Sequence, residues 1–102
     1  MVTKISNNQF DAIKAAPLAV VDFSATWCGP CKMLAPVFDG LAEEMTGVSF
    51  FSVDVDDNRD LAMQYGISSV PSILVFKNGA LAGQTVGFQP KEQLKHFIEA
   101  HA

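Results

Sequence analysis

Residues 18–32 read Leu18-Ala19-Val20-Val21-Asp22-Phe23-Ser24-Ala25-Thr26-Trp27-Cys28-Gly29-Pro30-Cys31-Lys32. The first six residues form a nearly continuous apolar run, which is typical of a strand buried on both faces. The only two cysteines of the chain follow, three residues apart. If a helix begins between them, one turn brings their Cβ atoms to about 5–6 Å, and a small adjustment closes a disulfide. Because Pro30 suits a first helical position, the stretch predicts a redox-active pair at a helix N-terminus.

The two cysteines are expected to play different parts in thiol–disulfide exchange, in which a thiolate attacks a disulfide sulfur. Cys28 lies where the helix N-terminus offers unpaired N–H groups and about half a positive charge, which lower the pKa of a thiol. We therefore expect Cys28 to be the exposed nucleophile. Cys31, one turn into the helix, is expected to be more buried and to act as the resolving thiol.

Asp22 is the candidate base that takes the proton of Cys31. A carboxylate in a strand buried on both faces is costly to ionise, so its pKa should rise toward neutrality. Residues two apart on a strand share a face, and we expect Asp22 and Ser24 to point toward the start of the helix that carries Cys31. An edge position or a helix-capping role is the alternative for Asp22, and the nearby cysteine pair favours the functional interpretation.

Length and charge restrict the classes of protein to consider. A chain of 102 residues fits one domain, residues 1–102, with a core of its own. The net charge is −4 and no basic cluster occurs, which argues against nucleic-acid binding. The apolar runs are far shorter than the roughly 20 residues of a membrane helix. No signal-peptide pattern opens the chain, so we expect a cytoplasmic location, where a cysteine pair is not expected to be a structural staple.

The rest of the chain predicts alternating strands and helices. The expected elements are a strand at 2–5, a helix capped by Asn7 or Asn8 and ending near Pro17, a strand at 18–23, a helix from Pro30 with Met45 on its apolar stripe, a strand at 48–55, a helix capped by Asp57 or Asn58 and closed by Gly66, strands 72–77 and 81–86 joined by Asn78-Gly79, and a helix opened by Pro90. Crossover helices make the early strands parallel, whereas the hairpin adds an antiparallel strand. We predict a mixed sheet with helices on both faces and Cys28 just beyond the carboxyl end of its central strand, where α/β sheets hold their active sites.

Motifs along the whole chain resemble those of the thioredoxin family. They are Val21 to Lys32, Ala35-Pro36, Val53-Asp54-Val55-Asp56, Val70-Pro71-Ser72, Phe76-Lys77-Asn78-Gly79 and Val86-Gly87. The stretch Trp-Cys-Gly-Pro-Cys-Lys is among the more specific short motifs known. The resemblance implies the thioredoxin fold, an α/β fold whose central mixed five-stranded sheet has the order 1-3-2-4-5 and is flanked by four helices.

The resemblance also implies the parts that individual residues play. Cys28 would be the nucleophile, Cys31 the resolving cysteine, and Asp22 a buried acid–base group that acts through a water. Gly29 and Pro30 would set the redox potential. Pro71 would be a cis-proline facing the cysteines, and the groove that docks the substrate backbone would be framed by Trp27, Val70, Pro71 and Gly87.

The activity implied by the resemblance is that of a general protein disulfide reductase, a protein-disulfide oxidoreductase. Its redox group would be the Cys28–Cys31 disulfide itself, with no cofactor. A flavin-containing thioredoxin reductase drawing on NADPH would recycle it, and its other partners would be disulfide-containing client proteins. We expect a cytoplasmic monomer that binds neither nucleic acid nor membrane.

Two positions depart from the commonest bacterial pattern. Ser24 stands where an aromatic residue often follows the buried Asp and Phe, and Ser52 stands where a lysine often neighbours that aspartate. We therefore expect desolvation, and not an ion pair, to shift the pKa of Asp22.

Other kinds of protein remain to be weighed against the reductase. The fold also serves as a redox-silent docking subunit of larger assemblies, but the retained cysteines, Asp22 and Pro71 argue against that role here. A disulfide oxidase or isomerase would need a more oxidising dithiol and an oxidising compartment. The run Asp54 to Asn58 begins like a calcium loop but lacks its glycine, and the two histidines have no further ligands at zinc spacing. We predict no metal site.

Overall fold

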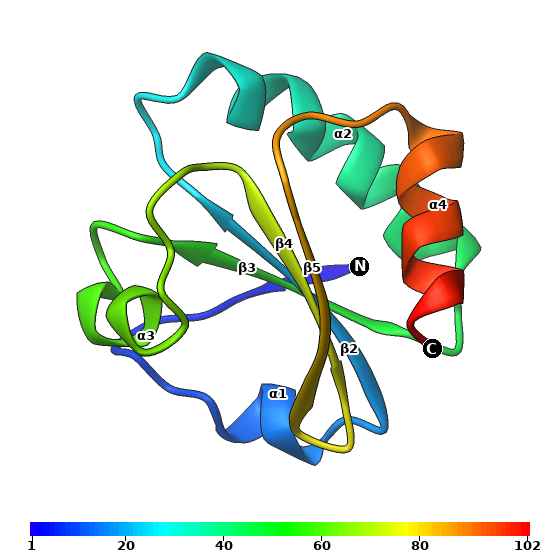
Figure 1. Cartoon of the computed structure of the whole chain (residues 1–102), viewed down its shortest axis with the longest axis horizontal. Helices are drawn as coiled ribbons and strands as arrows, with labels where there is room; N and C mark the ends of the chain where they lie inside the picture. The colour runs from blue at the N-terminus through cyan, green and yellow to red at the C-terminus, as the bar shows by residue number, and fades with distance from the viewer.

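The computed structural model describes residues 1–102. Its elements in chain order are β1 (Val2–Lys4), α1 (Asp11–Ala15), β2 (Leu18–Ser24), α2 (Gly29–Glu44), β3 (Ser49–Asp54), α3 (Arg59–Gln64), β4 (Ser72–Lys77), β5 (Ala80–Val86) and α4 (Lys91–Ala100). The strands form one five-stranded sheet of order β1-β3-β2-β4-β5 (Figure 1). The predicted fold class and strand order are confirmed.

Strand β2 occupies the centre of the sheet and carries the predicted acid. It runs parallel to β3 and antiparallel to β4, and β4 pairs in turn with antiparallel β5. In this register Asp22 lies level with Ser52 on β3 and with Ile73 on β4. Both neighbours are uncharged, so the sheet itself offers Asp22 no cation.

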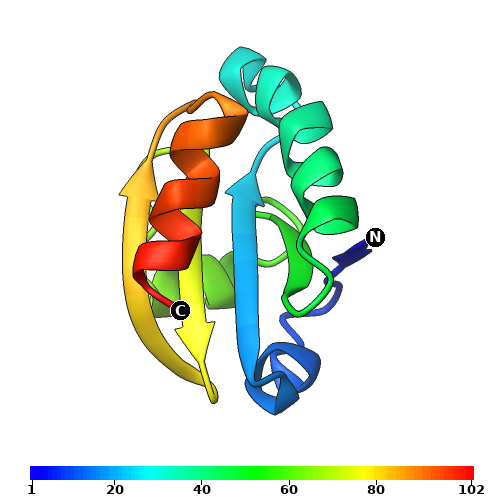
Figure 2. The same cartoon turned by 90° about the vertical axis from the view of Figure 1, so that its right-hand side faces the viewer.

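Helices cover both faces of the sheet, which explains why β2 reads as a continuous apolar run. One buried cluster joins α1 and α3 to the sheet and includes Val21 and Phe23 of β2. The other joins α2 and α4 to the opposite face and includes Val20. Figure 2 shows α4 and α2 on the near side of the sheet and α3 behind it. Since alternate residues share a face, Asp22 lies on the same side as Val20 and as helix α2.

Two turns follow the sequence signals closely. Asn78 and Gly79 have φ values of 52° and 82°, which is the left-handed pair that a tight two-residue hairpin requires. Gly66 has a φ of 64° just after α3. Its N–H donates to the Met63 carbonyl at 3.1 Å, and the Ile67 N–H donates to the Ala62 carbonyl at 2.9 Å. These are the two hydrogen bonds of a Schellman motif.

The predicted cap of the first helix is wrong. Helix α1 follows Phe10, which makes no side-chain cap bond, and both Asn7 and Asn8 adopt left-handed backbone conformations before it. The side chain of Asn8 instead accepts the N–H of Leu61 at 3.0 Å. Asn8 therefore caps α3 through Leu61, a residue 53 positions further along the chain, which no local pattern could indicate.

For α3 the predicted N-cap residue is correct, but the predicted side-chain cap bond is absent. Asn58 occupies the N-cap position, but its side chain makes no cap bond to the helix. Its amide group donates to the carbonyls of Ile5 and Asp54 instead. A buried side chain at this point thus joins two loops.

The remaining differences from the prediction are shifts of element ends. Helix α2 begins at Gly29, contains Pro36 and ends before Met45, which becomes its C-cap. Strand β3 is one residue shorter at each end than expected, and β5 begins at Ala80. Pro90 is the N-cap of α4. None of the helices combines the length and the apolar character needed to cross a membrane.

Candidate active site

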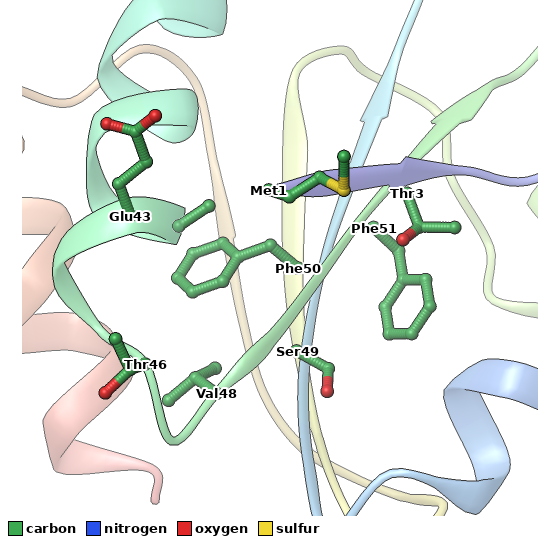
Figure 3. Close-up of a pocket in the computed structure, with 9 residues that line it drawn as sticks. Met1, Thr3, Glu43, Thr46, Val48, Ser49, Phe50 and Phe51 are labelled. Carbon is green, nitrogen blue, oxygen red and sulfur yellow. The ribbon is translucent and has the colours of Figure 1, made fainter.

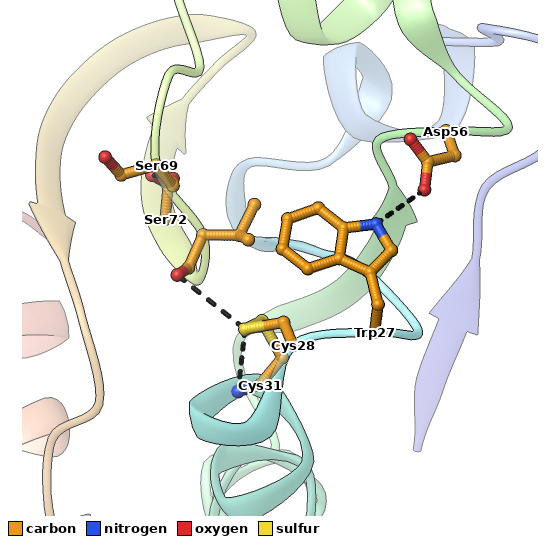
Figure 4. Close-up of a disulfide and its surroundings, with 7 residues drawn as sticks. Trp27, Cys28, Cys31, Asp56, Ser69 and Ser72 are labelled. Atoms are coloured by element: carbon orange, nitrogen blue, oxygen red, sulfur yellow. Dashed lines mark hydrogen bonds between the residues drawn. A yellow bond between two sulfur atoms is a disulfide. The ribbon is translucent and has the colours of Figure 1, made fainter.

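The cysteine pair lies at the junction between β2 and α2. Cys28 is the N-cap of α2, with an extended backbone (φ −94°, ψ 115°), and Cys31 lies in the first turn. The two form a disulfide with a Cα–Cα distance of 5.3 Å. The Cys31 N–H donates to Cys28 Sγ at 3.2 Å (Figure 4). The predicted placement of a disulfide on a helix N-terminus is what the structure contains.

The expected difference in exposure between the cysteines is wrong for this disulfide state. Cys28 is 6% exposed and Cys31 is 5% exposed, because Ala25, Val55 and Val70 pack around both. Their surroundings differ in another way. Cys28 Sγ lies 3.7 Å from the carbonyl oxygen of Val70, whereas Cys31 lines a separate hollow.

The hollow beside Cys31 measures about 190 Å³. Ser24, Asp54 and Lys32 contribute polar groups to its wall. Ser24, one of the two positions that depart from the expected pattern, lines this hollow with a small side chain. Cys31 is therefore next to a recess lined by both polar and apolar groups, whereas Cys28 Sγ faces the Val70 carbonyl.

The opposite wall of the site is the segment before β4. The Val70–Pro71 peptide bond is cis, as the resemblance implied. The N–H of Gly87, which follows β5, donates to the Pro71 carbonyl at 2.8 Å. Residues that are distant in sequence, Cys28, Val70, Pro71 and Gly87, are thus brought together at one end of the sheet.

Trp27 precedes the disulfide and stands mostly in solvent, 69% exposed. Its indole N–H donates to a carboxylate oxygen of Asp56 at 3.0 Å (Figure 4). A hollow of about 350 Å³ separates the tryptophan from the segment before β4, and Val55, Ile67 and Val70 line it with Trp27. Two of the four predicted groove residues line this hollow. The other two do not line it: Pro71 follows Val70 directly in the chain, and the Gly87 N–H is hydrogen-bonded to the Pro71 carbonyl.

Asp56 is a site residue that the sequence analysis did not assign. The available signal was its position just beyond the carboxyl end of β3, the strand parallel to β2. Parallel neighbours end at the same edge of a sheet, which is where α/β proteins hold their sites. The pattern Val-Asp-Val-Asp by itself indicates only a family motif, because nothing local shows which side chain Asp56 contacts.

Asp22 is buried where the prediction placed it. It is 5% exposed, and its Oδ1 atom has no hydrogen-bond partner. Burial alone raises the pKa of Asp22 from the ordinary 3.8 to about 7. The structure thus contains a carboxyl group that can gain or lose a proton near neutral pH, on the side of the sheet that α2 and Cys31 cover.

The other predicted positions occupy the rim. Gly29 and Pro30 are exposed residues of the first turn of α2, between the two cysteines. No group of three or more His, Cys, Asp or Glu side chains is arranged to hold a metal ion. The largest hollow, about 470 Å³, lies around Glu43, Thr46 and Phe50 (Figure 3) and contains none of the predicted site residues.

Comparisons with known proteins agree on one family. The Thioredoxin family model matches residues 1–100. The thioredoxins of Staphylococcus epidermidis and Staphylococcus aureus are each 42% identical over 101 residues, which span 98% of this chain and 97% of theirs. The solved structure of a Plasmodium falciparum thioredoxin is similar with a TM-score of 0.89 at 35% identity, covering 98% of this chain and 99% of that one.

These matches extend over nearly the whole chain, so they include the strand, the cysteine pair and the segment before β4 together. Fold, sheet order and cysteine spacing point the same way. The chain belongs to the thioredoxin family, whose members are protein-disulfide oxidoreductases that work by dithiol–disulfide exchange.

Proposed function

We propose that this chain is a general reductant of protein disulfides in which Cys28 attacks the client and Cys31 resolves the mixed disulfide. The observation that carries the proposal is the Cys28–Cys31 disulfide at the N-terminus of α2, on the side of the sheet that holds the buried Asp22. The redox group belongs to the chain itself. The remaining parts of the site position the client and move protons.

The first step is the attack of the Cys28 thiolate on one sulfur of the client disulfide. The client S–S bond breaks, a bond forms between Cys28 and the client, and the released client thiolate takes a proton from solvent. The Cys31 N–H lies 3.2 Å from Cys28 Sγ and belongs to the positive end of the α2 dipole. Both stabilise a negative sulfur, so they favour Cys28 as the attacking thiolate in the reduced protein.

The second step releases the client as a dithiol. The Cys31 thiol passes its proton through a water to the Asp22 carboxylate, and the Cys31 thiolate attacks Cys28 Sγ. The bond between Cys28 and the client breaks as the internal disulfide forms, and the second client thiolate is protonated. A base with a pKa of about 7 is suited to this transfer at neutral pH.

Client docking is assigned to the groove framed by Trp27, Val70, Pro71 and Gly87. The hollow between Trp27 and Val70 is apolar enough to hold a client side chain next to the disulfide. The Val70 carbonyl, 3.7 Å from Cys28 Sγ, is a hydrogen-bond acceptor for an extended client backbone. Between the cysteines, Gly29 and Pro30 set the redox potential through the geometry of the first turn.

We further propose that residues 1–102 act as one domain and as a cytoplasmic monomer. A flavin-containing thioredoxin reductase, drawing on NADPH, returns the disulfide to the dithiol, and disulfide-containing proteins are the clients. The similarity to whole thioredoxins over 98% of the chain supports this assignment.

Two other functions of this fold, a redox-silent docking subunit and a disulfide oxidase or isomerase, predict different redox behaviour. A redox-silent docking subunit is not favoured, because both cysteines are present at disulfide distance. An oxidase or isomerase would be substantially reduced by an ordinary glutathione pool. We expect the disulfide to remain mostly oxidised in that pool, because a good reductant has a dithiol that is hard to regenerate.

The test of the proposed function is insulin reduction, followed as turbidity in the presence of dithiothreitol. The wild-type chain should accelerate precipitation, whereas Cys31→Ser should fall to the rate of dithiothreitol alone, because its mixed disulfide has no internal thiol to resolve it. Cys28→Ser provides the control for loss of the first step. Equal activity of wild type and Cys31→Ser would contradict the dithiol mechanism.

A further inference from the structure

The turn that follows β3, residues Asp54–Asn58, carries the carboxylate that holds the Trp27 indole. The Asp56 N–H donates to Asp54 Oδ1 at 2.8 Å, and the Asp57 and Asn58 N–H groups donate to the Asp54 carbonyl at 3.2 and 3.0 Å. These bonds make the turn a compact unit. The position of the Asp56 side chain, and with it the 3.0 Å bond to Trp27, depends on where the turn is anchored.

Asn58 anchors this turn to the segment that follows β1. The residue is 0% exposed, and its side-chain amide donates to the Asp54 carbonyl at 3.0 Å and to the Ile5 carbonyl at 3.3 Å. Its Oδ1 accepts the N–H of Asn8 at 2.9 Å. Both amide hydrogens and the carbonyl oxygen are therefore used, and none of them caps the helix that Asn58 precedes.

We propose that Asn58 is a positioning residue for client docking: by fastening the Asp54–Asn58 turn to residues 5–8, it keeps the Asp56 carboxylate on the Trp27 indole and so fixes one wall of the groove. This inference rests on the proposed function, because the docking role of Trp27 is part of it. Asn58 itself touches neither client nor disulfide.

The indole needs such support because little else restrains it. Trp27 is 69% exposed, and its indole N–H makes one hydrogen bond, to the Asp56 carboxylate. An exposed ring that is free to rotate must be ordered when a client binds, which weakens binding without altering the chemistry at sulfur. The expected signature is a change in KM for large clients, together with a change in the surroundings of the indole.

The test compares Asn58→Ala with wild type in the full chain. Because Trp27 is the only tryptophan, intrinsic fluorescence and its quenching by acrylamide report on this side chain alone. Asn58→Ala should raise the acrylamide quenching constant and raise the KM for insulin by about threefold, with a much smaller change in kcat. The rate with a small aryl disulfide, which does not fill the groove, should fall by less than the insulin kcat/KM.

Asn8→Gly is the matched control. It removes the side-chain bond to the Leu61 N–H but keeps the backbone N–H that Asn58 accepts, and glycine suits the φ of 55° at this position. It should lower stability and leave Trp27 quenching and the insulin KM unchanged. Wild-type quenching and KM in Asn58→Ala would overturn the proposal, as would equal changes in both variants. If wild type itself fails to reduce insulin, the proposed function fails, and the quenching data still decide whether Asn58 positions Trp27.

A second pair of variants decides the matter if Asn58→Ala does not fold. Asp54→Ala removes the oxygen that accepts the Asp56 N–H, whereas Asp54→Asn keeps an oxygen in the same place. Asp54→Ala should increase acrylamide quenching of Trp27, and Asp54→Asn should resemble wild type. Quenching of Asp54→Ala at the wild-type level would show that the turn does not position the indole.

Discussion

Asp22 and Asn58 are both buried polar side chains near the same edge of the sheet, yet their surroundings are opposite. Asn58 is fully buried and satisfies its amide group with three hydrogen bonds to main-chain atoms of Ile5, Asn8 and Asp54. Asp22 is almost as buried, and its Oδ1 has no partner at all. A buried polar group without a partner costs free energy, whereas a satisfied one holds its neighbours in place.

The difference separates a structural polar group from a chemical one. Asn58 fastens loops, and its bonds need no change during the life of the protein. The cost at Asp22 is expressed in its pKa, which burial raises to about 7. Groups with such perturbed pKa values gather at functional sites, and the helix that carries Cys31 covers the same face. Substitutions at either residue, or beside it, should therefore have opposite and separable effects.

The largest expected effect is a gain in stability on Asp22→Asn above neutral pH. The folded pKa of about 7 lies above the ordinary 3.8. Between these values the folded protein keeps a proton that the unfolded chain has lost, so wild-type stability falls as the pH rises through this window. The whole interval corresponds to about 4 kcal/mol at and above pH 8. Asparagine does not ionise and should lack this loss.

Denaturant unfolding of the two oxidised proteins at pH 4 and pH 8 measures this effect. The free energy of unfolding of Asp22→Asn relative to wild type should rise by about 4 kcal/mol from the lower pH to the higher. Comparing the two pH values cancels the constant cost of the amide itself. Parallel pH profiles for the two proteins would contradict a raised pKa at Asp22.

Asn58→Ala should act in the opposite direction. It leaves the Ile5 carbonyl and the Asn8 N–H without their partner, and we expect a loss of about 2–3 kcal/mol in the free energy of unfolding. Because no ionisable group is removed, the loss should be the same at pH 4 and pH 8. A loss confined to one pH, or no loss, would show that the amide network does not hold the loops.

Ser52→Lys should make Asp22 more like the satisfied Asn58, because it offers the buried carboxylate a cationic partner. Residue 52 lies level with Asp22 on the neighbouring strand, and a cation there should lower the pKa of Asp22 by about one pH unit. Titration of the Asp22 carboxyl carbon by NMR measures this change. Ser52→Met is the control for side-chain length. Equal titration curves in the two variants would mean that the lysine does not reach the carboxylate.

Much of the fold could be predicted because its signals are local. Adjacent residues are enough to predict three of its elements. These are the apolar strand β2, the start of α2 at Cys28-Gly29-Pro30-Cys31 and the Asn78-Gly79 hairpin. The burial of Asp22 followed from the same strand pattern, since both faces of such an apolar strand are covered by helices.

The missed features depend on partners far away in the chain. Asn8 accepts the N–H of Leu61, 53 residues later in the chain, and Asn58 bonds to Ile5 and Asn8 near the N-terminus. Asp56 meets Trp27 across a separation of 29 residues. The two cysteines are likewise covered in part by Val55 and Val70, which the fold brings against them. No local spacing contains this information, because it arises only when the strand order is complete.

Resolution of the mixed disulfide, measured against pH, tests most directly whether Asp22 serves Cys31. An aryl disulfide mixed with the reduced protein releases one coloured thiol when Cys28 attacks and a second when Cys31 resolves. The second phase should be at least about tenfold slower in Asp22→Asn than in wild type at pH 7. The first phase should change much less. Equal second-phase rates in the two proteins across the neutral range would remove Asp22 from the mechanism.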